Sequence, residues 1–86
     1  MEGSNLEGLI LLNQLALGSF GIVRQLTAQG NTRRRLLDLG LINDTKVEAL
    51  IKSPFGDPIA YEIRGAVIAL RSEEASKILV ESVDMA

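Results

Sequence analysis

The chain lacks cysteine and histidine altogether. Without cysteine it forms no disulfide, and without either residue it has no thiolate or imidazole, the ligands that structural zinc sites most often use. Histidine is also the side chain that most often transfers protons near neutral pH. A Ser-His-Asp or Cys-His catalytic set is therefore excluded. The absence of cysteine agrees with a reducing compartment, so we expect a cytoplasmic protein.

The sequence also lacks a long hydrophobic run. The longest apolar stretch, Leu9–Leu12 with a loose extension to Leu17, is shorter than the ~20 residues that a bilayer requires. Glu2 and Glu7 precede it without a basic residue, which is untypical of a signal peptide. We therefore expect no direct membrane insertion.

Excess positive charge is missing as well. The formal net charge is −2, whereas a protein that binds nucleic acid broadly carries a basic face. We therefore expect no nucleic-acid partner. The 86 residues, 47% of them hydrophobic and 23% charged, are typical of one ordered domain. We predict a flexible leader over residues 1–8 and a single domain over residues 9–86.

Alternating apolar residues predict most of the chain to be β-structure. Residues 45–52 place Val47, Ala49 and Ile51 on one face, and residues 58–64 do the same with Ile59, Tyr61 and Ile63. The remaining predicted strands are residues 19–28, with a bulge or close approach at Gly21, residues 66–71, whose continuous apolar character predicts cover on both sides, and residues 80–83. Short strands with tight connections favour a mainly β fold, a small closed or nearly closed barrel with two short helices.

The first helix is predicted over residues 32–39. Asn31 is a plausible N-cap, and Gly40 stands where a left-handed residue ends a helix. Leu41 should then fold back on Leu36. A second helix, capped by Ser72, is predicted over residues 72–79.

Three consecutive arginines, Arg33, Arg34 and Arg35, crowd the N-terminal half of the first predicted helix, where the helix dipole mildly disfavours cations. One interpretation is that Arg34 pairs with Asp38 one turn later while the aliphatic stems cover Leu37. The other is that the three form a localised basic surface for an acidic partner.

Two other segments are candidate contact surfaces. Phe55, in the loop of residues 53–58, either tucks over the end of the barrel, the interpretation we favour slightly, or anchors a partner. Asp57 in the same loop joins Phe55 and the three arginines as a candidate partner-binding residue. The apolar stretch Leu9–Leu12 either packs across the barrel or buries itself against a second chain, so a homodimer is expected.

Catalytic and metal-binding chemistry is not expected. Capping, turns and solvation account for the carboxylates, which are Asp38, Asp44, Asp57, Glu73 and Glu74 among others. The glycine-bearing residues 18–21 lack the Lys-Ser/Thr of a phosphate-binding loop. We therefore predict no enzyme, no cofactor and no specific intrachain metal site.

Four motifs, taken in order, resemble the FeoA family, small cytosolic accessory proteins of bacterial ferrous-iron transport. They lie between about Leu11 and Val83. The family commonly has Pro-Gly where Asn43-Asp44 stands here, and the leader has no clear counterpart. The motifs are Leu12-x2-Leu15-x2-Gly18-x2-Gly21-x-Val23, R-L-x-x-L-G-L within residues 33–41, P-x-G-D-P within residues 53–65, and A-L-R-x-x-E-A-x-x-I within residues 69–80.

The resemblance implies an SH3-like small β-barrel and a role beside FeoB, the membrane transporter with a cytosolic GTP-binding domain. It implies no catalysis, so the expected function is that of a protein–protein interaction module acting on a FeoB-type transporter. The same domain also occurs fused to metal-responsive transcription regulators. The alternative is therefore a metal-responsive regulatory domain that works with a DNA-binding partner and binds a divalent transition metal.

Overall fold

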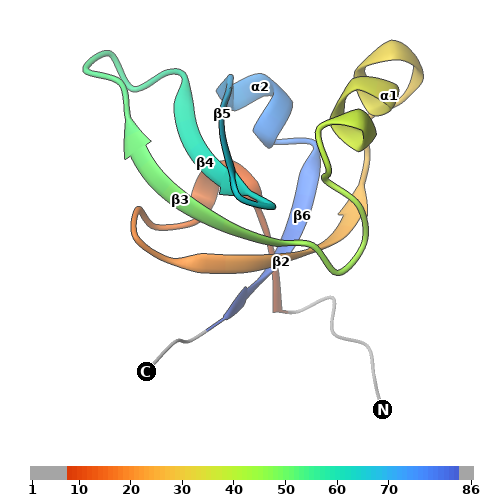
Figure 1. The fold of residues 1–86 in the computed structure, drawn as a ribbon, viewed down its shortest axis with the longest axis horizontal. Helices are drawn as coiled ribbons and strands as arrows, with labels where there is room; N and C mark the ends of the chain where they lie inside the picture. The colour runs from red at the N-terminus through yellow and green to blue at the C-terminus, as the bar shows by residue number, and fades with distance from the viewer. Residues whose placement is uncertain (1–7, 84–86) are drawn as a thin grey trace.

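A single antiparallel sheet and two helices make up residues 8–83, the part of the chain that the computed structural model describes (Figure 1). The predicted mainly β fold class and the two short helices are confirmed. The strands are β1 (Leu9–Leu11), β2 (Phe20–Leu26), β3 (Lys46–Lys52), β4 (Ile59–Ile63), β5 (Ala66–Leu70) and β6 (Ile78–Val83); the helices are α1 (Gly30–Asp38), α2 (Ser72–Ala75) and the short 3-10 helix η2 (Leu12–Gln14).

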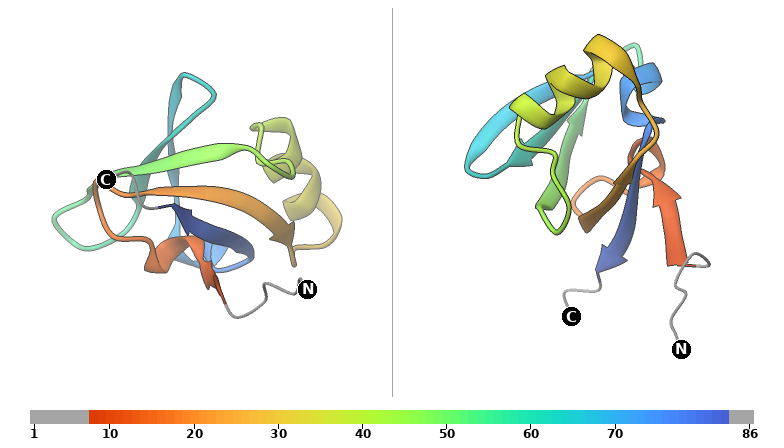
Figure 2. Two further views of the ribbon diagram at one scale, coloured as in Figure 1. Left: turned by 90° about the horizontal axis from the view of Figure 1, so that it is seen from below. Right: turned by 90° about the vertical axis from the view of Figure 1, so that its right-hand side faces the viewer.

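The sheet is open rather than closed. Its strand order is β1-β6-β2-β3-β4-β5, and within residues 8–83 no ladder of hydrogen bonds joins β1 to β5. The strand β1 is only three residues long, and at Leu12 the chain turns into η2, which contacts α2 instead of continuing beside β5. The sheet is nevertheless strongly curved, and the β4–β5 hairpin projects from the rest of it in both views of Figure 2.

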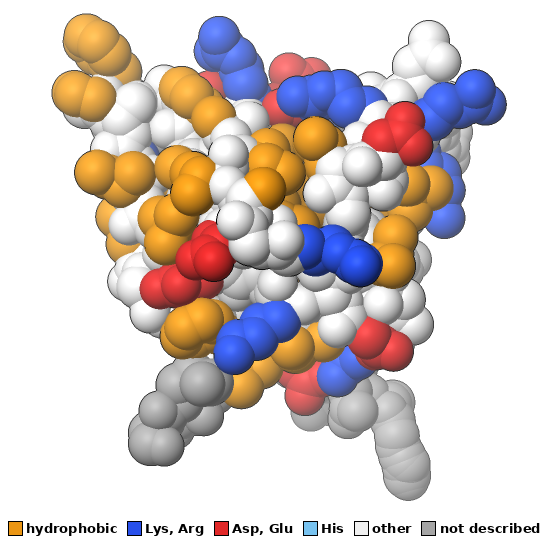
Figure 3. Space-filling model, in the orientation of Figure 1, with side chains coloured by type: hydrophobic (Ala, Val, Ile, Leu, Met, Phe, Trp, Pro, Cys, Tyr) orange, Lys and Arg blue, Asp and Glu red, His pale blue; other side chains and the backbone are white. Residues whose placement is uncertain are grey.

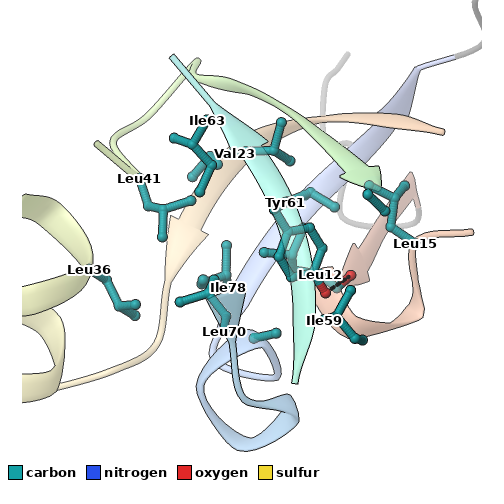
Figure 4. Packing of buried hydrophobic residues seen from close by; sticks show 14 of the residues in the cluster. Leu12, Leu15, Val23, Leu36, Leu41, Ile59, Tyr61, Ile63, Leu70 and Ile78 are labelled. Atoms are coloured by element: carbon teal, nitrogen blue, oxygen red, sulfur yellow. Dashed lines mark hydrogen bonds between the residues drawn. The ribbon is translucent and has the colours of Figure 1, made fainter. Parts of the chain in front are cut away.

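The concave side of the sheet holds the core (Figure 4). Tyr61 lies at its centre, fully buried, and its hydroxyl donates a 3.4 Å hydrogen bond to the carbonyl oxygen of Leu12. The predicted inward face of β4 is confirmed, because Ile59, Tyr61 and Ile63 are all buried. Leu36 brings α1 onto this core, and burial of such a side chain contributes ~1.5–3 kcal/mol.

The prediction for Gly21 is confirmed as a close approach. A Cβ atom there would lie 3.1 Å from Cγ2 of Val80, on the neighbouring strand β6. The irregularity of β2 falls elsewhere, because the register against β6 shifts between Val23 and Gln25. The glycine therefore lets two strands come together, while Arg24 forms the bulge.

Two predictions about buried faces are wrong. In β3 the register against β4 shifts between Ala49 and Ile51, so an extra residue, Leu50, turns Ile51 outward and leaves it 65% exposed. In β5 the apolar run is not covered on both sides, because Leu70 is buried while Ala66, Val67 and Ala69 are exposed. Val67 at its centre is 67% exposed.

The helix boundaries differ from the prediction at the start of α1 and at the end of α2, which stops at Ala75 instead of residue 79, because Ile78 and Leu79 already belong to β6. Helix α1 begins at Gly30 after Gln29, two residues earlier than expected, and Asn31 is not its N-cap. Its predicted end is confirmed: Gly40 has a φ of 100°, and the amide of Leu41 donates to the carbonyl of Leu36 at 3.1 Å. Helix α2 is one turn long, and Arg71 rather than Ser72 is its N-cap.

The apolar N-terminal segment packs on its own chain. Leu9–Leu11 forms β1 beside β6, and Leu12 and Leu15 are buried in the core. The segment is extended over Leu9–Leu11 and continues as the single turn of η2. Apart from Gly8, the predicted leader lies outside the described residues.

Candidate interaction surface

Helices α1 and α2 lie at the same end of the molecule, and Lys and Arg side chains gather over this end in Figure 3. The three arginines of α1 diverge from one another. Nη1 of Arg33 donates to the carbonyl oxygen of Leu26 at 3.2 Å, which ties α1 to the end of β2. Arg35 forms an ion pair with Glu74 and so ties α1 to α2.

Arg34 differs from its two neighbours. It is exposed, and within residues 8–83 it forms no ion pair; the predicted pair with Asp38 is not formed. The first interpretation of the arginines is therefore wrong for Arg34. Arg33 and Arg35 thus contact other elements of the fold, whereas Arg34 is exposed.

Phe55 is not tucked over the end of the sheet. Its side chain is 93% exposed, and hydrophobic side chains project at the upper left of Figure 3, where Figure 1 places the β3–β4 loop. The loop itself is held by hydrogen bonds: the Ser53 hydroxyl donates to the Asp57 carbonyl at 2.7 Å, and the Gly56 amide donates to the Ser53 carbonyl at 2.8 Å. An ordered loop thus presents a bare aromatic ring to solvent.

Asp57 has a structural role. Its Oδ1 accepts a 2.7 Å hydrogen bond from the amide of Ser72, one of the amides at the start of α2 that have no partner within the helix. Its Oδ2 lies 3.8 Å from Nη1 of Arg71. From the other side, Nδ2 of Asn13 donates to Oγ of Ser72 at 3.0 Å. The start of α2 therefore joins the β3–β4 loop to η2, with Asp57 as the link.

The charge of Asp57 also acts on the core. Burial raises the pKa of the Tyr61 hydroxyl to about 12, and the nearby Asp57 carboxylate contributes to the increase. Tyr61 is therefore a neutral hydrogen-bond donor near pH 7.

Two shallow grooves flank α1. The first lies between α1 and β2, has a volume of about 390 Å³, and includes the half-exposed Leu37 and Ile42 beside Arg24 and Arg33. Sequence reasoning missed Arg24, which bonds Glu81 on β6 at 3.0 Å and pairs with Asp44; these partners are distant in sequence, so no local signal marks them. The second groove, of about 380 Å³, is lined by Arg35, Pro58, Ala69, Arg71, Glu73 and Glu74.

The site residues predicted from sequence do not form one cluster. Arg33, Arg34 and Arg35 share α1, while Phe55 and Asp57 belong to the β3–β4 loop. Residues 8–83 contain no group of three or more carboxylates arranged to hold a metal ion. In the same residues, no helix has the length and apolar character needed to span a bilayer. The arrangement offers separate surfaces for contact.

The model of the FeoA domain matches residues 10–82, which include every strand, at least in part, and both helices. The chain belongs to the FeoA family. A curated relative from Porphyromonas gingivalis (strain ATCC BAA-308 / W83), the Fe(2+) transport protein A/Fe(2+) transporter FeoB fusion protein, is 29% identical over 72 residues. That match covers 84% of this chain and only 8% of the relative.

Solved structures agree with this assignment. The solution structure of a FeoA-like protein from Clostridium acetobutylicum is 34% identical, with a TM-score of 0.84 over 92% of each chain. A zinc complex of FeoA from Stenotrophomonas maltophilia is 28% identical, with a TM-score of 0.75 over 84% of this chain and 89% of that one. The latter protein is described as a procaryotic SH3 domain protein and a candidate activating factor of ferrous iron transport.

Proposed function

We propose that this chain is an accessory protein of ferrous-iron transport that acts by binding the cytosolic part of a FeoB-type transporter. The observation that carries the proposal is the relative in which a FeoA segment and FeoB are one polypeptide. Fusion gives two interacting modules a high effective concentration, and the same pair in separate chains must associate through a surface. The proposal places this chain in the cytoplasm, on the side where a GTP-binding domain lies.

We propose further that the fold works as an SH3-like binding module rather than as an enzyme. The relative described as an SH3 domain protein supports this, as does the curvature of the sheet in Figure 2. Several carboxylates have structural partners: Asp44 and Glu81 hold Arg24, Glu74 holds Arg35, and Asp57 caps α2. Because these carboxylates are engaged in holding the fold together, we assign the surface a role in binding other molecules and not in catalysis.

The contacts to the transporter are assigned to Arg34 and Phe55. Arg34 is the arginine of α1 without a structural partner in residues 8–83, and α1 carries three cations against one anion on a chain whose net charge is −2. A local positive surface on an acidic protein favours an acidic partner. Aromatic and arginine side chains also contribute most of the binding energy at protein interfaces.

A pull-down with the cytosolic GTP-binding domain of a FeoB transporter tests the proposal. We expect Arg34→Glu and Phe55→Ser each to reduce the affinity for that domain by about tenfold or more, since interface anchors contribute ~2 kcal/mol. Lys46→Glu makes the same charge change on another element, and Leu17→Ser removes a different exposed apolar side chain. These two controls should bind as the unmodified chain does. Failure of the unmodified chain to bind would refute the proposal.

The metal-responsive alternative makes a different prediction, namely tight binding of a divalent transition metal. Calorimetric titration with manganous and ferrous ions distinguishes the two. The accessory function predicts no heat above that of a chelator control, and a reproducible one-to-one isotherm would favour the alternative.

The predicted homodimer through Leu9–Leu12 stays a prediction, for which sedimentation at several concentrations is the measurement.

A further inference from the structure

Among residues 8–83, no strand pairs with the outer edge of β5. Natural sheets protect their edges with charged residues, proline, bulges or very short strands. The strand β5 has none of these: Ala66–Leu70 is five apolar residues, and its pairing with β4 is regular throughout. The opposite edge differs, because β1 has three residues and the amide of Leu11 is occupied by Oε1 of Gln14 at 2.9 Å.

The β4–β5 turn determines which backbone groups of β5 are free. Arg64 and Gly65 form a two-residue turn with φ values of 54° and 86°, typical of a type I′ hairpin, and Ile63 pairs with Ala66. In such a hairpin the pair next to the turn exchanges both hydrogen bonds, and the pattern alternates from there. Ala66, Ile68 and Leu70 therefore bond to β4, while Val67 and Ala69 direct their amide and carbonyl groups outward.

Space for another chain lies beside this edge. The groove of about 380 Å³ that is lined by Ala69 runs between β5 and the two helices, with the Arg35–Glu74 ion pair in its wall. Within residues 8–83, no backbone hydrogen bond is made by Val67 or Ala69 outside their own hairpin. A single extended segment could add to the sheet here.

The charges at the ends of β5 favour a partner strand with acidic ends. Arg64 precedes the strand and Arg71 follows it; the side chain of Arg71 is 71% exposed, and its guanidinium lies 3.8 Å from the Asp57 carboxylate. If two copies paired through β5 about a two-fold axis at Ile68, Arg64 of one copy would lie opposite Ser72 of the other, and Arg71 opposite Gly65. At both ends an arginine of one copy would then lie one position from an arginine of the other, and like charges at such a distance repel each other. Acidic residues at both ends of a partner strand would instead meet an arginine each.

We propose that the edge of β5 binds an extended segment of another protein, with an apolar centre of about five residues and an acidic residue at each end, as an added strand. Main-chain bonds to Val67 and Ala69 supply the affinity, and Arg64 and Arg71 supply the specificity. This edge is separate from Arg34 on α1 and from Phe55 in the β3–β4 loop, the two residues assigned to the transporter.

The probe is a synthetic peptide of that length, with five alternating valine and alanine residues between two terminal aspartates. On binding, we expect amide hydrogen exchange at Val67 and Ala69 to slow by about tenfold or more, while Ala66 and Ile68 are already protected. A control peptide with lysine at both ends should bind about tenfold more weakly. A control peptide N-methylated at every residue, which has no amide donor on either edge, should not bind.

Substitution of the chain provides the matched test. Val67→Pro removes an outward amide without breaking the ladder to β4, so it should abolish binding while the fold is retained. Val67→Thr keeps the amide and should bind. Ala69→Pro repeats the test at a second position should Val67→Pro fail to fold. No slowing of exchange at either residue, equal binding of the lysine peptide, or a dimer that Val67→Pro dissolves would each overturn the proposal, whatever the result of the pull-down with FeoB.

Discussion

Replacing Asp57 with alanine should destabilise the fold without touching the core. The carboxylate accepts the amide of Ser72 at 2.7 Å, and that amide has no partner inside α2. The helix α2 is a single turn, and the other side chain that holds its first residue is Asn13, which donates to Oγ of Ser72 at 3.0 Å. In Asp57→Ala, the amide of Ser72 loses its acceptor and the guanidinium of Arg71 loses the nearby carboxylate.

The magnitude follows from the two interactions that are lost. Removal of a side chain that caps a helix start costs ~0.5–2 kcal/mol. The contact with Arg71 adds little, since it spans 3.8 Å and the side chain of Arg71 is 71% exposed, and such pairs contribute ~0–1 kcal/mol. We therefore expect the free energy of unfolding to fall by about 1–2 kcal/mol, which lowers Tm by about 5–15 °C in a domain of this size. Asp57→Asn keeps an oxygen acceptor and should cost about half as much or less.

Urea unfolding followed by far-UV circular dichroism measures these differences, with Arg71→Ala as the control for the ion pair. The reasoning is refuted if Asp57→Ala unfolds at the same urea concentration as the unmodified chain, or if Arg71→Ala costs as much as Asp57→Ala. A second readout is available because Tyr61 is the chain's one tyrosine and the chain has no tryptophan. Asp57→Asn should lower the pKa of Tyr61, seen in the ultraviolet absorbance of tyrosinate, because a nearby negative charge is removed.

Three further outcomes follow from the core. Gly21→Ala should cost ~1–3 kcal/mol, because its Cβ would lie 3.1 Å from Val80, and thermal melting measures this. Leu36→Ala should cost ~2–5 kcal/mol in urea unfolding, whereas Leu37→Ala, at a side chain that is 38% exposed, should cost less than half as much. Tyr61 has a folded pKa of about 12 against an ordinary 10.0, so the folded state holds this proton more tightly. The contribution of Tyr61 to the free energy of unfolding should be fully present below about pH 10 and be lost as the pH rises towards 12. Tyr61→Phe should remove this loss.

Features set by local sequence were predictable. The alternation of Ile59, Tyr61 and Ile63 places them in the core because side chains of a strand point to opposite faces in turn. Gly40 ends α1 because a left-handed residue is required there and glycine adopts it without steric cost. In each case the physical cause lies within a few residues of its effect.

Features set by distant neighbours were not predictable. The outward turn of Ile51 depends on a bulge against β4, and Val67 is exposed because it lies beside Glu62, on the face of β5 opposite the buried Leu70. An apolar run in sequence is compatible with a covered strand or with an edge that binds a partner. The role of Asp57 in capping α2, 15 residues away, is likewise visible only once the loop and helix are placed side by side.

The three arginines show how fold and function share one segment. Arg33 and Arg35 hold α1 to β2 and α2, so reversing all three charges would loosen the helix and reduce partner binding by misfolding alone. A charge reversal at Arg34 avoids this, since that side chain makes no ion pair within the described chain. Reversal of Arg35, in contrast, places a second carboxylate beside Glu74 and should lower Tm. Only loss of binding at unchanged Tm, which Arg34→Glu is expected to give, assigns the charge of α1 to a partner.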